Sequence, residues 1–168
     1  MNEHPILGQV ALGYCPMIDR QRNVMATRLT VFALRPDVKT DAAALFDALA
    51  EIWPAGDKRR VVLNITSEEL LRDTLAAPPP MQVMLEVPAF MAADPQLEPT
   101  LRSLHAAGVA LLVKGRPAAE LPCAVLECFQ HAIIEQVEDQ RAPAAAPAGA
   151  ARALSFVQSG VTRVSEVE

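Results

Sequence analysis

Polar residues that could bind a ligand stand at the ends of three apolar segments. Asn64 closes the run Val61–Leu63, Glu86 lies near the end of QVMLEV, and Lys114 follows VALLV. In folds with parallel strands, the carboxyl ends of the strands meet at one edge of the sheet, and ligands bind there. Amide and carboxylate oxygens suit hard cations, whereas an ammonium group attracts anions. The three strand ends therefore combine two oxygen donors, which suit a cation, with one positive charge, which suits an anion.

Each of these side chains also has a purely structural interpretation. Asn64 could cap the next helix or satisfy backbone groups at the end of its strand. Glu86 could form an ion pair with Lys114, or it could be a solvated residue of the rim. Arg28, in an earlier apolar segment, could form an anion pocket together with Lys114, or both cations could simply face solvent.

The elements around these residues follow from apolar runs and the residues that interrupt them. Val10–Ile18 and Val24–Leu34 read as strands, and the short polar link Asp19–Asn23 predicts that they pair as an antiparallel hairpin. After a strand at Arg60–Asn64, the pair Thr66 and Glu69 predicts a capping box for a helix over residues 67–75. Thr40 or Asp41 is expected to cap a helix that runs through about Ile52. The remaining expected elements are a strand at Gln82–Val87, a loop at Pro88–Asp94, a helix at Glu98–Ala107, strands at Val109–Val113 and Cys123–Leu126, a helix through Phe129, Ile133 and Val137, and a strand at Ala153–Val157.

Strands that alternate with short helices predict an α/β fold of parallel βα repeats, opened here by the antiparallel hairpin. Such repeats are typical of a TIM-type barrel, but a complete barrel needs roughly 250 residues. With 168 residues we expect an incomplete barrel. We interpret residues 1–168 as a single domain with a low-complexity Ala/Pro linker over residues 140–152. Either its sheet is open, or the chain is a fragment of a longer protein that is truncated on the C-terminal side.

Composition narrows the class of protein. The net charge is −5 and no basic patch is visible, which argues against a nucleic-acid polymer as partner. No apolar run reaches membrane-spanning length. Cys15, Cys123 and Cys128 have no metal-binding spacing, so we expect buried free thiols in a reducing compartment. A cytoplasmic protein without a membrane partner is the expectation.

The order of segments resembles that of a bacterial EAL domain, the cyclic di-GMP phosphodiesterase fold, in the variant joined to an HDOD domain. Tyr14–Arg20 (YCPMIDR) is similar to the opening strand of that family, whose usual form is RQPIxDR. Val24–Phe32 stands in the place of its signature strand. Val62–Leu70 (VLNITSEEL) is similar to INxSxExL, and Gly108–Pro117 stands where the family has GxxIALDDFG. The order covers nearly the whole chain, and the Asn64 segment is its most specific part.

The resemblance implies a site whose metal ligands are mostly missing. Active members hold metal ions with carboxylates and one asparagine, and these ions activate water against a phosphodiester. Here Asn64 and Glu86 remain, Arg28 takes the position of the signature glutamate, and Phe32 replaces a phosphate-gripping arginine. Lys114 and the glycine after it replace the paired aspartates. Two oxygen ligands are too few for a dinuclear site, and cations at metal positions repel metal.

The resemblance and these replacements together predict a catalytically inactive EAL-like domain. We expect a regulatory or protein-interaction module in bacterial signal transduction, with no catalytic residue, no metal and no cofactor, and with a protein or an adjoining signalling domain as partner. One alternative is a binder of cyclic di-GMP or another anion that does not cleave it, with Arg28 and Lys114 as anion contacts. A second alternative is an active phosphodiesterase with displaced ligands.

Overall fold

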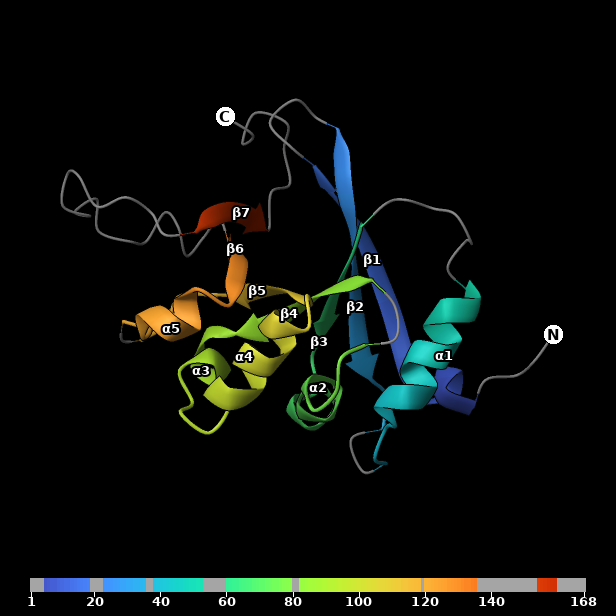
Figure 1. The fold of residues 1–168 in the computed structure, drawn as a ribbon. Helices are drawn as coiled ribbons and strands as arrows, with labels where there is room; N and C mark the ends of the chain where they lie inside the picture. Colours follow the sequence, from blue (N-terminus) through green and yellow to red (C-terminus); the bar gives the residue numbers. More distant parts are fainter. Residues whose placement is uncertain are drawn as a thin grey trace. The chain divides into compact units, whose positions relative to one another are not determined.

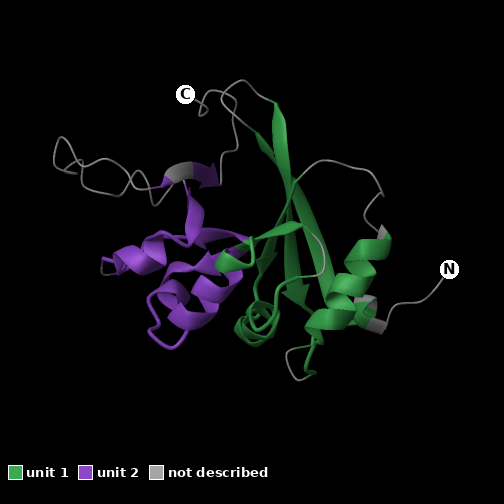
Figure 2. Ribbon diagram, in the orientation of Figure 1, with its two compact units in different colours: residues 1–85, 106–109 green, residues 86–105, 110–168 purple. Residues whose placement is uncertain are grey.

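The chain folds into two compact units of mixed α/β structure (Figure 1, Figure 2). The computed structural model describes residues 5–18, 23–35, 38–52, 60–79, 82–118, 120–135 and 154–159. Unit 1 comprises Met1–Leu85 and Ala106–Val109, and unit 2 comprises Glu86–His105 and Ala110–Glu168. Among the described residues, no helix is both long and apolar enough to cross a membrane.

Unit 1 begins with the predicted antiparallel hairpin. After the short helix η1 (Pro5–Gly8), strand β1 (Val10–Ile18) pairs with β2 (Val24–Ala33), and the register shifts once near the end of β1. Polar residues between the two apolar strands force the chain to reverse, and local pairing then satisfies the backbone groups of both strands. The prediction of two paired strands is therefore confirmed to within one residue at each end.

Parallel strands follow in unit 1, as the βα pattern predicted. Strand β3 (Arg60–Ile65) pairs in parallel with β2. The first three residues of β4 (Val83–Pro88) belong to unit 1 and pair in parallel with β3, and the strand continues into unit 2 at Glu86. Val62 and Leu63 have no exposed surface, as expected for a strand covered on both faces. Such burial contributes about 1.5–3 kcal/mol per large aliphatic side chain, so the apolar core of unit 1 is centred on β3.

Two helices cover unit 1. Helix α1 (Ala42–Ile52) lies beside the hairpin (Figure 1). Asp41 begins it, because the side-chain oxygen Oδ1 accepts a hydrogen bond from the Ala43 backbone N–H at 2.9 Å, as an N-cap does. Helix α2 (Glu68–Leu75) follows β3 and buries one leucine-rich face. Both helices lie where the sequence predicted them.

Unit 2 continues the α/β pattern with short elements. A one-turn helix, α3 (Ala89–Ala92), stands where we expected a loop, and α4 (Glu98–Ala106) then buries Leu101 and Leu104. Gly108 ends this segment with a φ of +83°, a conformation that glycine adopts at little cost. Strand β5 (Ala110–Lys114) follows, so the predicted helix and strand are confirmed and the predicted loop is wrong.

The assignments over residues 123–135 are corrected by the structure. Cys123–Leu126, expected as a strand, forms the one-turn helix α5, and the segment expected as a helix from Phe129 forms strand β6 (Phe129–Glu135). Strand β6 lies between β5 and β7 (Ser155–Ser159), in parallel with both. Backbone pairing with β5 on one side and β7 on the other keeps this segment extended, although the spacing of its apolar residues also fits a helix.

Several predictions fall outside the described residues. The polar link Asp19–Asn23, apart from Asn23, and the Ala/Pro segment at 140–152 lie there. The single-domain interpretation of residues 1–168 stays a prediction, and the incomplete EAL-type barrel does too. The mixed α/β class, the antiparallel opening hairpin and the parallel pairs that follow it are confirmed.

Candidate functional site

Asn64 lies on β3 and contacts β2 through its side chain. The residue is 6% exposed, and its amide nitrogen Nδ2 donates a hydrogen bond to the Thr30 hydroxyl oxygen at 3.2 Å. Thr30 is also the register partner of Asn64 in the parallel β2–β3 pair. In adjacent strands, register partners point to the same face of the sheet. The Asn64 amide nitrogen is therefore tied to a neighbouring strand, and the N-cap of the next helix is Ser67.

Arg28 lies on the same face of β2 as Thr30, two residues before it. It is the register partner of Val62 on β3 and of Cys15 on β1, and its side chain is half-buried. Residues two apart in a strand share a face and are separated by roughly 7 Å. Thr30 was not among the predicted site residues, but it is closer to Asn64 than Arg28 is. Its polarity in the apolar segment VMATRLTVFA was the available signal.

Phe32 continues this face of β2 toward the carboxyl end of the strand. Its side chain is 45% exposed. A Cβ atom placed on Gly13 of the paired strand would lie 3.3 Å from the Phe32 ring, which is a tight contact, so the glycine leaves room for the aromatic ring. The face of the hairpin thus presents, along β2, the guanidinium of Arg28, the hydroxyl of Thr30 and then an aromatic ring.

The turn between β3 and α2 differs from the predicted capping box. Ser67 is the N-cap residue, because its hydroxyl accepts a hydrogen bond from the Leu70 backbone N–H at 3.4 Å. Thr66 instead donates both its hydroxyl and its backbone N–H to the Val31 carbonyl oxygen, each at 3.0 Å. The threonine therefore joins the turn to the end of β2, next to the Asn64–Thr30 contact.

Glu86 belongs to unit 2 and is buried. Only 1% of its surface is exposed, so the interpretation as a solvated rim residue is wrong. Among the described residues, no buried side-chain nitrogen or oxygen lacks a hydrogen-bond partner, and Glu86 takes part in a polar interaction. A buried carboxylate that is already engaged in the protein differs from an open metal ligand.

Lys114 ends β5 in unit 2. It is half-buried and pairs in register with Ile133 of β6. The next residue, Gly115, has a φ of +81° and donates its N–H to the Ile133 carbonyl oxygen at 2.7 Å. This turn redirects the chain directly after the lysine. The predicted ion pair between Glu86 and Lys114 stays a prediction, and the anion pocket of Lys114 with Arg28 does as well.

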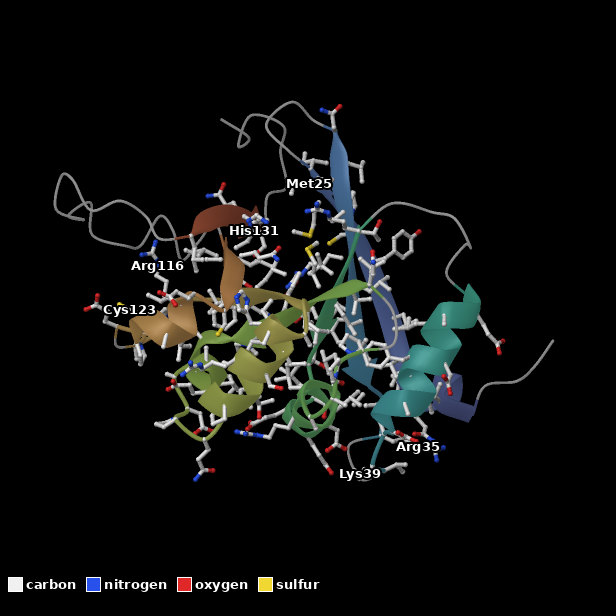
Figure 3. The ribbon with its side chains drawn as sticks, in the orientation of Figure 1. Met25, Arg35, Lys39, Arg116, Cys123 and His131 are labelled. Atoms are coloured by element: carbon white, nitrogen blue, oxygen red, sulfur yellow. The ribbon has the colours of Figure 1, made fainter. Side chains whose placement is uncertain are left out.

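Two other polar residues of unit 2 lie on β6 and on the loop after β5. His131 lies on β6, in register with Leu112 of β5 and Ser155 of β7, and Arg116 is exposed on the loop that follows β5 (Figure 3). Each of the two residues has an interaction partner within the protein.

The structure shows how far His105 and the three cysteines are exposed. His105 is exposed on α4. Cys128 is buried, but Cys15 and Cys123 are exposed, so the expectation of three buried thiols is wrong for two of them. Both exposed cysteines lie in short or edge elements, where fewer neighbours are available to cover them.

The donor set does not fit a pair of catalytic metal ions. Throughout the described part of the chain, no three His, Cys, Asp or Glu side chains lie together as metal ligands would. The amide nitrogen of Asn64 donates to Thr30, so the amide oxygen is at most one neutral ligand, and the cation of Arg28 lies on the same face. Hard divalent cations need several oxygen ligands around one point. No family profile matches the chain, and no curated protein resembles it closely enough to be a relative.

Proposed function

We propose that this chain is a degenerate EAL-type domain that does not hydrolyse cyclic di-GMP and that serves as a regulatory or protein-interaction module in bacterial signalling. The observation that carries the proposal is the face shared by β2 and β3. This face presents a guanidinium at Arg28 and an asparagine whose amide is bonded to Thr30. In EAL domains, which the sequence resembles, the corresponding positions hold metal ligands.

Electrostatics explains why this face disfavours a divalent cation. An ion held at the level of Asn64 would lie about 7 Å from the level of Arg28, two residues along the strand. At an effective dielectric constant of about 20, the repulsion between a divalent ion and a guanidinium at that separation is roughly 5 kcal/mol. A neutral amide oxygen does not offset such a cost. The hydrolytic step of an EAL enzyme needs metal-activated water, so the proposed domain lacks the means for it.

A second candidate is a binder that holds an anion without cleaving it. Arg28 and Lys114 are both half-buried cations on strands, and half-buried cations can bind a phosphate more strongly than fully solvated ones. Phe32, at the position where the resemblance predicts a phosphate-gripping arginine, favours the first candidate. A partner protein or an adjoining signalling domain therefore remains the proposed ligand of the module.

Isothermal titration with cyclic di-GMP, without metal and with Mg²⁺ or Mn²⁺, distinguishes these functions when turnover is measured in parallel. We expect neither binding heat nor product, while an active EAL domain in the same buffers shows both. Tight binding without turnover would replace the proposal by the second candidate. In that case Arg28→Ala and Lys114→Ala should weaken binding, whereas Arg102→Ala, an exposed cation on α4, should not.

Turnover would overturn the proposal outright, provided that it comes from this chain. Asn64→Ala and Glu86→Gln test this, because a site with displaced ligands would still depend on the two oxygen ligands that remain.

Arg28→Glu tests the electrostatic argument. It should raise the affinity for Mn²⁺ by about tenfold or more, since each 1.4 kcal/mol of removed repulsion corresponds to a factor of ten. An unchanged Mn²⁺ affinity would show that Arg28 is not what keeps metal away.

A further inference from the structure

Strand β1 is an open edge of the sheet in unit 1. Among the described strands it pairs only with β2. Its nine residues, VALGYCPMI, include no charged side chain, although edge strands are usually protected by charges. Tyr14, in the middle of β1, is 82% exposed. An uncharged edge with a solvent-exposed aromatic residue is the kind of surface on which another strand can be added.

The backbone groups available on this edge belong to Val10, Leu12 and Tyr14. The Leu34 N–H donates to the Gln9 carbonyl oxygen at 2.8 Å, so Gln9 and every second residue after it direct their backbone groups toward β2. The residues between them direct theirs outward. Pro16 has no N–H to offer, and the register shifts after Met17. The usable part of the edge therefore ends at Tyr14.

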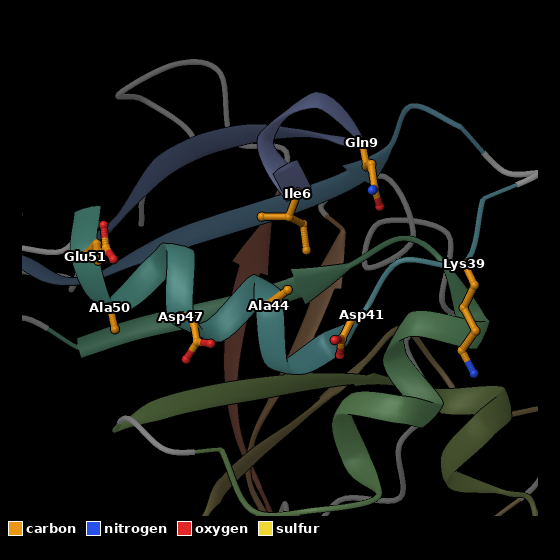
Figure 4. A pocket seen from close by; sticks show the side chains of 8 residues that line it. All are labelled: Ile6, Gln9, Lys39, Asp41, Ala44, Asp47, Ala50 and Glu51. Atoms are coloured by element: carbon orange, nitrogen blue, oxygen red, sulfur yellow. The ribbon is translucent and has the colours of Figure 1, made fainter. Parts of the chain in front are cut away.

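A groove of about 560 Å³ lies between η1 and α1, at the end of the hairpin where β1 begins (Figure 4). Gln9, directly before β1, belongs to its wall. Its apolar surface comes from Ile6 and from small side chains of α1, and carboxylates stand along it. The lining residues are Ile6, Gln9, Lys39, Asp41, Ala44, Asp47, Ala50 and Glu51.

The charge of the groove is dominated by its carboxylates. Lys39 directs its ammonium group to Asp73 of α2, at 3.1 Å, and reaches Glu69 only at 4.0 Å. The remaining charged residues that line the groove are acidic. A ligand for this groove should therefore bring apolar surface and a hydrogen-bond donor, and it should bring no carboxylate.

We propose that the groove and the edge are occupied by a second copy of this chain. The β1 strands of the two copies pair antiparallel about a two-fold axis at Leu12, and Tyr14 of each copy lies opposite Val10 of the other. Val10 and Tyr14 point to the same face of the strand, because they are an even number of residues apart. This arrangement carries each Tyr14 to the groove beside the other copy's η1, where its hydroxyl donates to a carboxylate.

The two surfaces are complementary in chemistry. Strand β1 brings no charge to an acidic groove, and its most exposed side chain ends in a donor, which carboxylates accept well. Pairing of the three outward residues of each strand forms about six backbone hydrogen bonds. The two tyrosines together bury roughly 300 Å² of the 1,000 Å² or so that a specific interface requires.

Sedimentation velocity and light scattering over a concentration series test this assembly, which does not depend on the proposed function. We expect the natural chain to form a dimer. Tyr14→Asp, which brings a carboxylate to the groove, and Leu12→Lys, which charges the edge, should each weaken the dimer by at least about tenfold. Phe90→Asp is the matched control, because Phe90 is a 65% exposed aromatic residue on α3 in unit 2. Circular dichroism verifies that each variant is folded.

A disulfide provides a second test that does not rely on a destabilising variant. Residues in a hydrogen-bonded antiparallel pair have Cα atoms about 5.5 Å apart, which suits a disulfide. Leu12→Cys, in a background with Cys15→Ser and Cys123→Ser, should therefore oxidise to a covalent dimer. Thr27→Cys on β2 serves as the control. A monomer at all concentrations, a dimer insensitive to Tyr14→Asp, or equal cross-linking of both cysteine variants would each overturn the proposal.

Discussion

The contact between Asn64 and Thr30 allows a quantitative test of what Asn64 does. Its amide donates to the Thr30 hydroxyl at 3.2 Å, and Asn64 is 6% exposed. Thr30→Val and Asn64→Leu remove the two partners while nearly preserving side-chain volume. A neutral hydrogen bond contributes about 1 kcal/mol net to stability, and an unsatisfied buried partner costs about 1–3 kcal/mol. Thr30 is half-buried, so water can partly replace its lost partner.

We therefore expect each single substitution to lower the free energy of unfolding by about 1–2 kcal/mol, with a coupling energy of about 0.5–1 kcal/mol between them. Urea unfolding of the natural chain, both single variants and the double variant measures this coupling. Thr27→Val is the control partner, because Thr27 is the register partner of Val61 and points to the other face of β2. Its effect should add to that of Asn64→Leu without coupling.

A coupling energy indistinguishable from zero would refute the reasoning. The hydrogen bond would then not hold the Asn64 amide against β2. A coupling in the expected range would identify Asn64 as a residue that joins β3 to β2. The asparagine would in that case have a structural role independent of any metal.

Two further predictions concern residues that sequence reasoning placed incorrectly. Ser67→Ala should lower the free energy of unfolding by about 1 kcal/mol, because it removes the N-cap of α2; chemical denaturation should show Glu69→Gln within about 0.5 kcal/mol of the natural chain, and the opposite ranking would restore the capping box. Burial raises the pKa of the Cys128 thiol, and less of it is the reactive thiolate. A maleimide followed by mass spectrometry should therefore label Cys15 and Cys123 in the folded protein and Cys128 only after unfolding; equal labelling of all three would contradict the burial.

Local sequence patterns were sufficient where an element is decided by its own residues. The β1–β2 hairpin follows from two apolar segments separated by a polar link, and α1 begins at Asp41 because a carboxylate near the helix start accepts a free backbone N–H. Leu101 and Leu104 are buried on α4 at helical spacing. In these elements the chemistry of neighbouring residues determines the outcome before any distant contact forms.

Local patterns failed where two structures fit the same residues. The apolar residues from Phe129 onward fit either a helix or a strand, and pairing with β5 and β7 decides for the strand. Thr66 and Ser67 both suit an N-cap, and the Val31 carbonyl at the end of β2 engages Thr66, which leaves Ser67 to cap the helix. Competition of this kind is decided by a partner that is distant in sequence.

The sequence by itself determined the α/β class, most element positions and the cations at Arg28 and Lys114. Only the tertiary structure decided that Thr30 is the partner of Asn64, because these residues are 34 positions apart and meet through the β2–β3 register. It also decided that Glu86 is buried rather than solvated. The physical reason is that burial and hydrogen bonding depend on which strands and helices cover a residue, and a residue's neighbours in the chain do not specify this.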